Sequence, residues 1–177
     1  GLAQYQIAKG AKGITVQKLG EAEVMADAGI RDMLLTFNVV GRQKVERLAA
    51  LANRSDIAVV ADNHDMIEGL SAAGRLSARN ISVLVECDTG AGRNGVQSPA
   101  ATLELARAID KSAYLSFVGL MTYAGTGQRL QAASFLEEAR ALLEKSGLEV
   151  RVISSGGSPD MWKDEGLSKL TEYRAGT

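Results

Sequence analysis

A run of serine and glycine carries the strongest chemical signal in this sequence. Ser155, Gly156, Gly157 and Ser158 follow a short apolar stretch and precede a proline. Glycines leave backbone amides unhindered, serines add hydroxyl groups, and a helix starting at the proline adds positive dipole charge. Amides and a helix dipole together oppose the charge of a phosphate. The tract predicts a phosphate cradle, with an ordinary glycine turn as the alternative.

A second glycine-rich segment, DTGAGRNG, spans residues 88–95 directly after another apolar run. Its spacing matches the G-x-G-x-x-G pattern of dinucleotide-binding proteins. In that pattern the glycines open a helix, whereas here the helix signal begins later, at Ser98 and Pro99. We therefore interpret the glycines as a flexible frame that points Arg93 and Asp88 into the mouth of a β/α barrel. A surface ion pair between these two side chains is the alternative.

Three further polar side chains stand at the ends of predicted strands. Tyr123 ends one strand, where its ring can pack against a planar cofactor and its hydroxyl can hydrogen-bond, although a plain packing role is equally compatible with its position. Gln17 and Lys18 end the first strand. Lys18 has the chemistry of a Schiff-base lysine, but Glu21 and Glu23 lie close enough in sequence to pair with it.

Composition excludes several other classes of chemistry. His64 is the only histidine and Cys87 the only cysteine, so this chain lacks the usual ligands of a transition-metal site. His64 also stands at an expected helix start, which disfavours a Ser-His-Asp triad. Lys and Arg are interleaved with Asp and Glu at a net charge of -1, which disfavours nucleic acid and anionic lipid as partners.

The lone cysteine, the lack of a leader-like segment and the lack of long apolar runs lead us to expect a cytoplasmic location. Small-molecule chemistry is then the favoured function.

Short β-branched apolar runs alternate with longer amphipathic segments along the whole chain, which predicts repeated βα units around a parallel sheet. Strands are predicted at residues 13–16, 32–36, 57–61, 81–86, 117–121, 150–154 and 170–174. Helices are predicted at residues 2–9, 20–28, 42–52, 65–76, 99–111 and 130–145.

This order favours an α/β fold, an incomplete (β/α)8 TIM-type barrel whose first strand lies upstream of Gly1. The C-terminal strand ends of such a barrel form one active-site face. A doubly wound open sheet is the alternative.

Several segments resemble one protein family, in the same order, over the whole chain. They include residues 10–30, 83–96 (VLVECDTGAGRNGV), 117–126 (FVGLMTYAGT), 154–162 (SSGGSPDMW) and 171–177 (TEYRAGT). The chain resembles the D-threonine aldolase and D-serine dehydratase group of the alanine-racemase-like, fold type III pyridoxal-phosphate barrels. The resemblance implies one barrel domain over residues 1–177 that binds pyridoxal 5'-phosphate in an enzyme acting on D-amino acids.

We expect the cofactor to contact eight residues of this chain. They are Gln17, Arg93, Tyr123, Ser155, Gly156, Gly157, Ser158 and Arg174. By the resemblance, the serine-glycine tract would hold the phosphate and Arg93 would face the phenolic oxygen, where a cation stabilises negative charge. Tyr123 would lie against the pyridine ring. Arg174 would lie near the pyridine nitrogen and disfavour its protonation.

Two functional parts of the family have no match between residues 1 and 177. The lysine that forms the Schiff base would lie just before Gly1. The His and Cys or Asp ligands of a divalent metal, manganese or zinc, would belong to a C-terminal β domain after Thr177. Ala91 and Asn94 also differ from residues frequent in the racemase and aldolase branches. We therefore expect the segment by itself to be inactive.

For the intact protein the resemblance implies a homodimeric, D-threonine aldolase-like lyase that cleaves β-hydroxy D-amino acids to glycine and an aldehyde. D-serine dehydratase and amino-acid racemase are the alternatives within the same fold. A non-catalytic pyridoxal-phosphate barrel is a third, and a sugar-phosphate isomerase or aldolase barrel without pyridoxal is a fourth.

Overall fold

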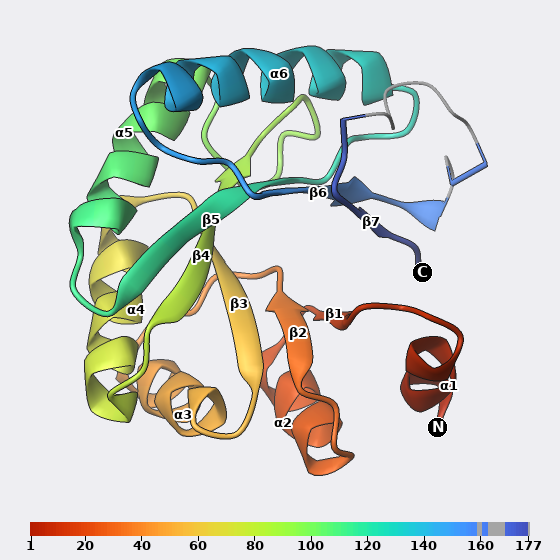
Figure 1. Cartoon of the computed structure of the whole chain (residues 1–177), viewed down its shortest axis with the longest axis vertical. Helices are drawn as coiled ribbons and strands as arrows, with labels where there is room; N and C mark the ends of the chain where they lie inside the picture. Colours follow the sequence, from red (N-terminus) through yellow and green to blue (C-terminus); the bar gives the residue numbers. More distant parts are fainter. Residues whose placement is uncertain (159–160, 163–168, 177) are drawn as a thin grey trace.

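The computed structural model of the chain describes residues 1–158, 161–162 and 169–176 (Figure 1). Its helices are α1 (Leu2–Ala8), α2 (Leu19–Asp27), α3 (Arg42–Ala52), α4 (His64–Ser77), α5 (Pro99–Lys111) and α6 (Arg129–Lys145). Its strands are β1 (Ile14–Val16), β2 (Asp32–Leu35), β3 (Asp56–Ala61), β4 (Ile81–Cys87), β5 (Leu115–Thr122), β6 (Val152–Gly156) and β7 (Glu172–Arg174). Every predicted helix and strand is present; α3 and α5 have the predicted bounds, and the other elements differ at one or both ends.

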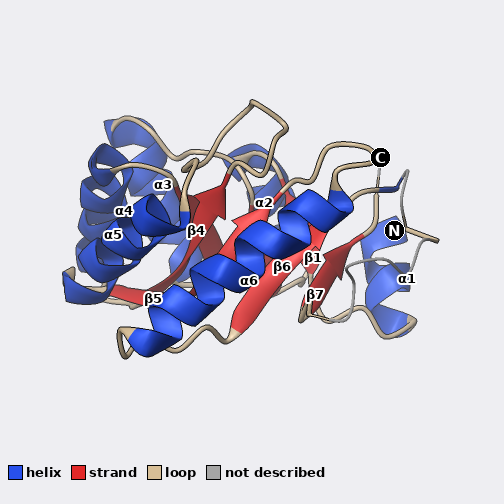
Figure 2. Cartoon of the chain, turned by 90° about the horizontal axis from the view of Figure 1, so that it is seen from above, coloured by secondary structure: helices blue, strands red, loops and turns tan. Residues whose placement is uncertain are grey.

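The seven strands lie side by side in chain order, and every pair is parallel. The helices α2 to α6 cover the outside of the curved sheet, as Figures 1 and 2 show. The strand order has no reversal, so the doubly wound alternative is wrong and the prediction of an incomplete barrel is confirmed. β1 and β7 form the two edges of the nearly closed barrel.

Two apolar clusters lie on opposite faces of the sheet. The larger one fills the space between the strands and the helices, and includes Val83 and Val85 of β4. The smaller one fills the barrel interior and is built around Leu34, Val60, Leu84, Val118 and Met121. Successive side chains of a strand point to opposite faces. Glu86, two residues after Leu84, therefore points into the barrel at its C-terminal end.

A bulge in β5 changes which of its side chains face inward. The register between β4 and β5 shifts next to Gly119, where an added Cβ would lie 1.9 Å from the Val152 carbonyl oxygen. Val118 faces the interior before the bulge and Met121 after it, whereas Leu120 packs against the helices. Tyr123, two residues beyond Met121, follows at the mouth of the barrel.

Ser98 and Pro99 begin α5 as predicted, since the Ser98 hydroxyl accepts a hydrogen bond from the Ala101 amide at 3.2 Å. Replacing Ser98 with alanine is expected to lower the free energy of unfolding by about 1 kcal/mol, because it removes this cap. Ser98→Asp keeps an acceptor and should restore most of the loss. Urea denaturation of the three proteins measures both changes, and equal stability of all three would contradict a capping role.

Candidate functional site

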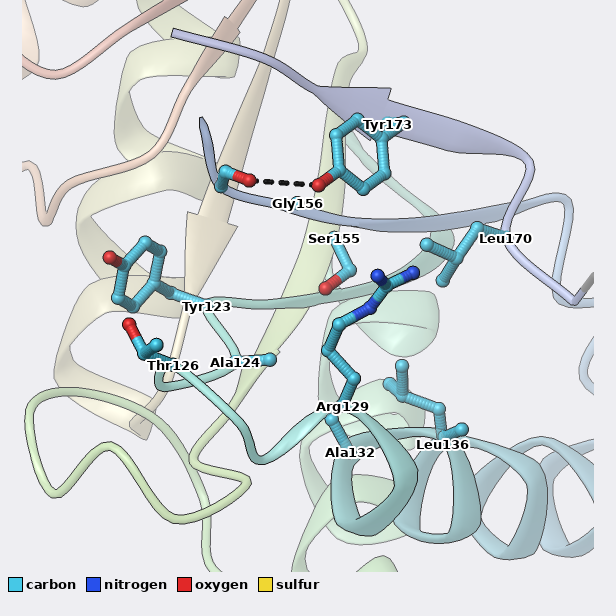
Figure 3. Close-up of a pocket in the computed structure, with 12 residues that line it drawn as sticks. Tyr123, Ala124, Thr126, Arg129, Ala132, Leu136, Ser155, Gly156, Leu170 and Tyr173 are labelled. Atoms are coloured by element: carbon cyan, nitrogen blue, oxygen red, sulfur yellow. Dashed lines mark hydrogen bonds between the residues drawn. The ribbon is translucent and has the colours of Figure 1, made fainter. Parts of the chain in front are cut away.

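A pocket that is open to solvent lies between the ends of β5 and β6 and the start of α6 (Figure 3). Four of the predicted site residues line it: Tyr123, Ser155, Gly156 and Gly157. Figure 3 shows Ser155 between the Tyr123 and Tyr173 rings on one side and α6 on the other. The fold therefore brings the serine-glycine tract and the predicted ring-packing tyrosine to one cavity.

The first half of the serine-glycine tract belongs to a strand. β6 continues through Ser155 and Gly156, two residues beyond its predicted end, because these residues pair with Tyr173 and Arg174 of β7. Gly156 has φ +144°, and an added Cβ would lie 2.5 Å from the Arg174 carbonyl oxygen. Glycine is therefore required here by the close approach of β7 as well as by any ligand.

The second half of the tract is held by the end of the chain. The Tyr173 hydroxyl donates to the Gly157 carbonyl oxygen at 2.8 Å, the contact drawn in Figure 3. The Ser158 hydroxyl accepts from the Gly176 amide at 3.1 Å and donates to the Gly176 carbonyl. The predicted phosphate contact from Ser158 therefore competes with these two hydrogen bonds, whereas Ser155, Gly156 and Gly157 face the pocket.

Arg93 and Tyr123 meet although thirty residues separate them in sequence. The Arg93 guanidinium carbon lies 4.6 Å from the centre of the Tyr123 ring, which is a cation-π arrangement. The Asp88 carboxylate instead accepts hydrogen bonds from the Gly90 and Gly92 amides, both at 3.0 Å. Asp88 thus stabilises its own loop, and the alternative of an ion pair between Asp88 and Arg93 is wrong.

Arg174, at the end of β7, hydrogen-bonds to the ends of β5 and β6 inside the barrel mouth. Its guanidinium donates to the Thr122 carbonyl oxygen at 2.6 Å and to the Ser154 hydroxyl. The Ser154 hydroxyl in turn donates to the Glu172 carboxylate. Burial lowers the pKa of Arg174, while Glu172 and Glu86 act against that shift. The guanidinium is therefore fixed next to the strand end that carries Tyr123.

Glu86 is a site residue that sequence reasoning missed. Its side chain is almost fully buried, at 2% exposure, and its Oε2 atom has no hydrogen-bond partner among the described residues. Burial, with a smaller contribution from the charges of Asp62 and Asp88, raises the pKa of Glu86 to about 7, and Arg93 and Arg174 act in the opposite direction. An acidic residue at an inward position of an otherwise apolar strand was the available signal.

Arg129 is a second residue that was missed. It is the first residue of α6 and lines the pocket, and Figure 3 shows its side chain extending from the helix toward Ser155. A cation at a helix N-terminus opposes the helix dipole and so is unfavourable for the helix itself. An arginine at this unfavourable position of a predicted helix was the signal in the sequence that its side chain serves the pocket rather than the helix.

Gln17 stands apart from the other predicted site residues. It follows β1 at the same end of the barrel, but it does not line the pocket, and its backbone amide donates to the Glu21 carboxylate at 2.8 Å. The Lys18 amide also donates to Glu21, at 3.3 Å, while Glu23 pairs with Arg47. Within the described residues, no ion pair joins Lys18 to either glutamate.

His64 begins α4 as predicted and lies on the surface, with Nε2 3.2 Å from the Glu104 carboxylate. Cys87 is buried, and burial raises the pKa of its thiol to about 12. Across the described ranges, no three His, Cys, Asp or Glu side chains gather as metal ligands, and no helix is long and apolar enough to cross a membrane.

Comparison with known proteins places these observations in a family. The chain matches the model of the alanine racemase N-terminal domain over residues 1–177. It is 34% identical to a D-threonine aldolase from Arthrobacter sp, an alignment that covers 99% of this chain and 49% of the relative. It is 32% identical to a 3-hydroxy-D-aspartate aldolase from Paracoccus denitrificans, covering 95% of this chain and 46% of the relative.

Comparison with solved structures also finds a D-threonine aldolase. The crystal structure of a D-threonine aldolase from Filomicrobium marinum matches with a TM-score of 0.94 and 33% identity, covering 99% of this chain and 50% of that one. The chain spans about half the length of the curated relatives it matches. It belongs to the family of alanine racemase N-terminal domains.

Proposed function

We propose that residues 1–177 form the pyridoxal 5'-phosphate-binding barrel domain of a D-threonine aldolase-like lyase, which cleaves β-hydroxy D-amino acids to glycine and an aldehyde. One observation carries this proposal: Tyr123 meets Arg93 on its ring face and shares a pocket with Ser155, Gly156 and Gly157. An aromatic face, a cation and a glycine-rich turn are the groups that a planar, anionic cofactor needs. The aldolase names of the relatives support the reaction.

The chemistry of the lining residues fits this cofactor. Ser155, Gly156 and Gly157 offer a hydroxyl and a backbone unobstructed by side chains to a phosphate. Arg129, on the opposite wall, adds positive charge. Tyr123 offers its ring to the pyridine, and Arg93 offers a guanidinium to the phenolic oxygen. The Gly156 backbone lies where any larger residue would collide with β7, so the cradle depends on glycine.

Arg174 determines the electrostatics at the pyridine nitrogen in this proposal. When bound, pyridoxal phosphate supplies an electron-withdrawing ring that stabilises negative charge at the amino-acid Cα. A guanidinium has only donors, and that of Arg174 is fixed by Thr122 and Ser154. It therefore holds the nitrogen unprotonated and limits the electron withdrawal.

The remaining parts are proposed to come from the rest of the intact protein. By the family resemblance, these are the Schiff-base lysine and the ligands of a manganese or zinc ion. The segment 1–177 is then inactive without them, and the intact enzyme is a cytoplasmic homodimer. Gln17 and Ser158 are kept as cofactor contacts of the intact enzyme, Ser158 only if its bonds to Gly176 open.

Replacing Arg93 with alanine in the intact protein is expected to raise the Kd for pyridoxal 5'-phosphate by about 10- to 100-fold. The change removes a charged hydrogen bond, worth about 1.5–3 kcal/mol, from the phenolic oxygen. Arg42→Ala is the matched control, because Arg42 is exposed on α3 and forms an ion pair with Glu46 of the same helix. Absorbance titration measures both constants. Equal affinity of the Arg93 variant and the wild type would remove Arg93 from the site.

The reaction is tested by incubating the intact protein with D-threonine and manganese. We expect glycine and acetaldehyde, and no product from L-threonine. Pyruvate from D-serine without aldehyde from D-threonine would identify a dehydratase, and interconversion of D- and L-alanine would identify a racemase. Pyridoxal phosphate binding without turnover would identify a non-catalytic barrel. Turnover of a sugar phosphate without pyridoxal phosphate binding would overturn the proposal.

A further inference from the structure

Glu86 presents a buried acceptor that the described protein does not satisfy. Its side chain points into the barrel mouth, is 2% exposed, and leaves Oε2 without a hydrogen bond among the described residues. By contrast, Asp62, an acid whose charge acts on Glu86, accepts from the Asn38 and Asn63 side-chain amide groups and from the Gly95 backbone amide. A buried carboxylate without a donor is costly in its ionised form. The ionised Glu86 carboxylate would therefore be stabilised by a hydrogen-bond donor that the described residues do not provide.

The loop that carries Arg93 follows Glu86 in the chain, and its far end returns to hydrogen-bond with the Glu86 backbone. The Val96 amide donates to the Glu86 carbonyl oxygen at 2.9 Å, and the Asp88 amide donates to the Val96 carbonyl oxygen at 2.9 Å. The Gly95 amide joins the loop to Asp62 at 3.3 Å. These bonds fix the base of the loop, so that movement of the Arg93 side chain does not require β4 to move.

Four charged groups act on the Glu86 carboxyl, from three parts of the chain. Asp62 follows β3, Asp88 and Arg93 lie in the loop after β4, and Arg174 comes from β7. Arg174 already donates to Thr122 and Ser154. Arg93 rests on the Tyr123 ring and makes no ion pair within the described part of the chain. Arg93 is thus the cation whose donors are available to Glu86.

We propose that Glu86 is a positioning residue, whose ionised carboxylate receives the Arg93 guanidinium when an anionic ligand draws it from the Tyr123 ring into the barrel mouth. A guanidinium has donors for both a carboxylate and a phenolic oxygen, so one side chain can bridge the two. The inference rests on the proposed function, because the anionic ligand is the cofactor. It assigns to Glu86 the orientation of Arg93 and no contact with the reacting atoms.

The test uses 4'-deoxypyridoxine 5'-phosphate, which has the ring, the phenolic oxygen and the phosphate but no aldehyde, so it cannot form a Schiff base. Its Kd is measured by calorimetry at pH 8 for the intact wild-type protein and for E86Q, R93A and the double variant. E86Q is expected to weaken binding about tenfold in the wild-type background and less than twofold in the R93A background, since coupled residues are non-additive. E104Q, at an exposed glutamate of α5, is the control.

A second measurement separates positioning from general stability. At pH 6, where unpaired Glu86 holds its proton, binding should release more protons from the wild type than from E86Q, as calorimetry in two buffers of different ionisation enthalpy reports. An equal loss of affinity from E86Q with and without Arg93, or equal proton release, overturns the inference but leaves the cofactor assignment standing. Failure of the wild type to bind the probe overturns both.

Discussion

Replacing Glu86 with glutamine is expected to stabilise the cofactor-free intact protein at pH 8 while changing its stability little at pH 5. Burial raises the pKa of Glu86 from an ordinary value of 4.5 to about 7. The folded protein therefore binds this proton more tightly than the unfolded chain does. The resulting stability is present in full below pH 4.5 and is lost as the pH rises through 7, a loss of about 2–3 kcal/mol between pH 5 and pH 8.

Glutamine has nearly the same shape as glutamate and does not ionise, so E86Q removes this dependence on pH. Urea denaturation at pH 5, 6, 7 and 8 gives the free energy of unfolding of each protein. The advantage of E86Q over the wild type should grow steadily over that range. E104Q changes an exposed carboxyl and should show no such growth. A constant difference between E86Q and the wild type would mean that Glu86 does not titrate in this range.

Local patterns in the sequence were sufficient to predict the fold. Each βα unit is made of residues adjacent in the chain, so apolar runs and helix signals such as Ser98 and Pro99 report it directly. The end of β6 was misplaced because Ser155 and Gly156 extend the strand by pairing with Tyr173. That pairing partner lies eighteen residues away and leaves no local mark on the tract.

The candidate site was predictable only where residue type alone was informative. Arg93 and Tyr123 stood out as a cation and an aromatic ring next to strand ends, and the structure brings them into contact. Asp88 was misjudged because its role is set by the path of its own loop. Glu86 was missed because its importance comes from burial and from distant charges, which no short segment of sequence contains.

Gly156 also depends on a distant strand, so a single added methyl group at this position should damage both the fold and the site. Replacing it with alanine is expected to lower the free energy of unfolding of the intact protein by about 3 kcal/mol. A side chain is strained at φ +144°, and the new Cβ would meet the Arg174 carbonyl oxygen and amide nitrogen at 2.5 and 2.6 Å. Pushing β7 away would also displace Arg174 and the Gly157 backbone, so the Kd for pyridoxal 5'-phosphate should rise at least about tenfold.

Gly10→Ala separates the two causes of that damage. Gly10 also has a positive φ, +101°, but nothing lies within 4 Å of an added Cβ. It should therefore show only the backbone strain, about 1 kcal/mol in urea denaturation, and unchanged cofactor affinity. If the two variants lose equal stability, the contact with β7 contributes nothing, and glycine is required at position 156 by its backbone angle alone. If Gly156→Ala binds the cofactor as tightly as the wild type, the serine-glycine tract is a structural turn and the phosphate must be held elsewhere.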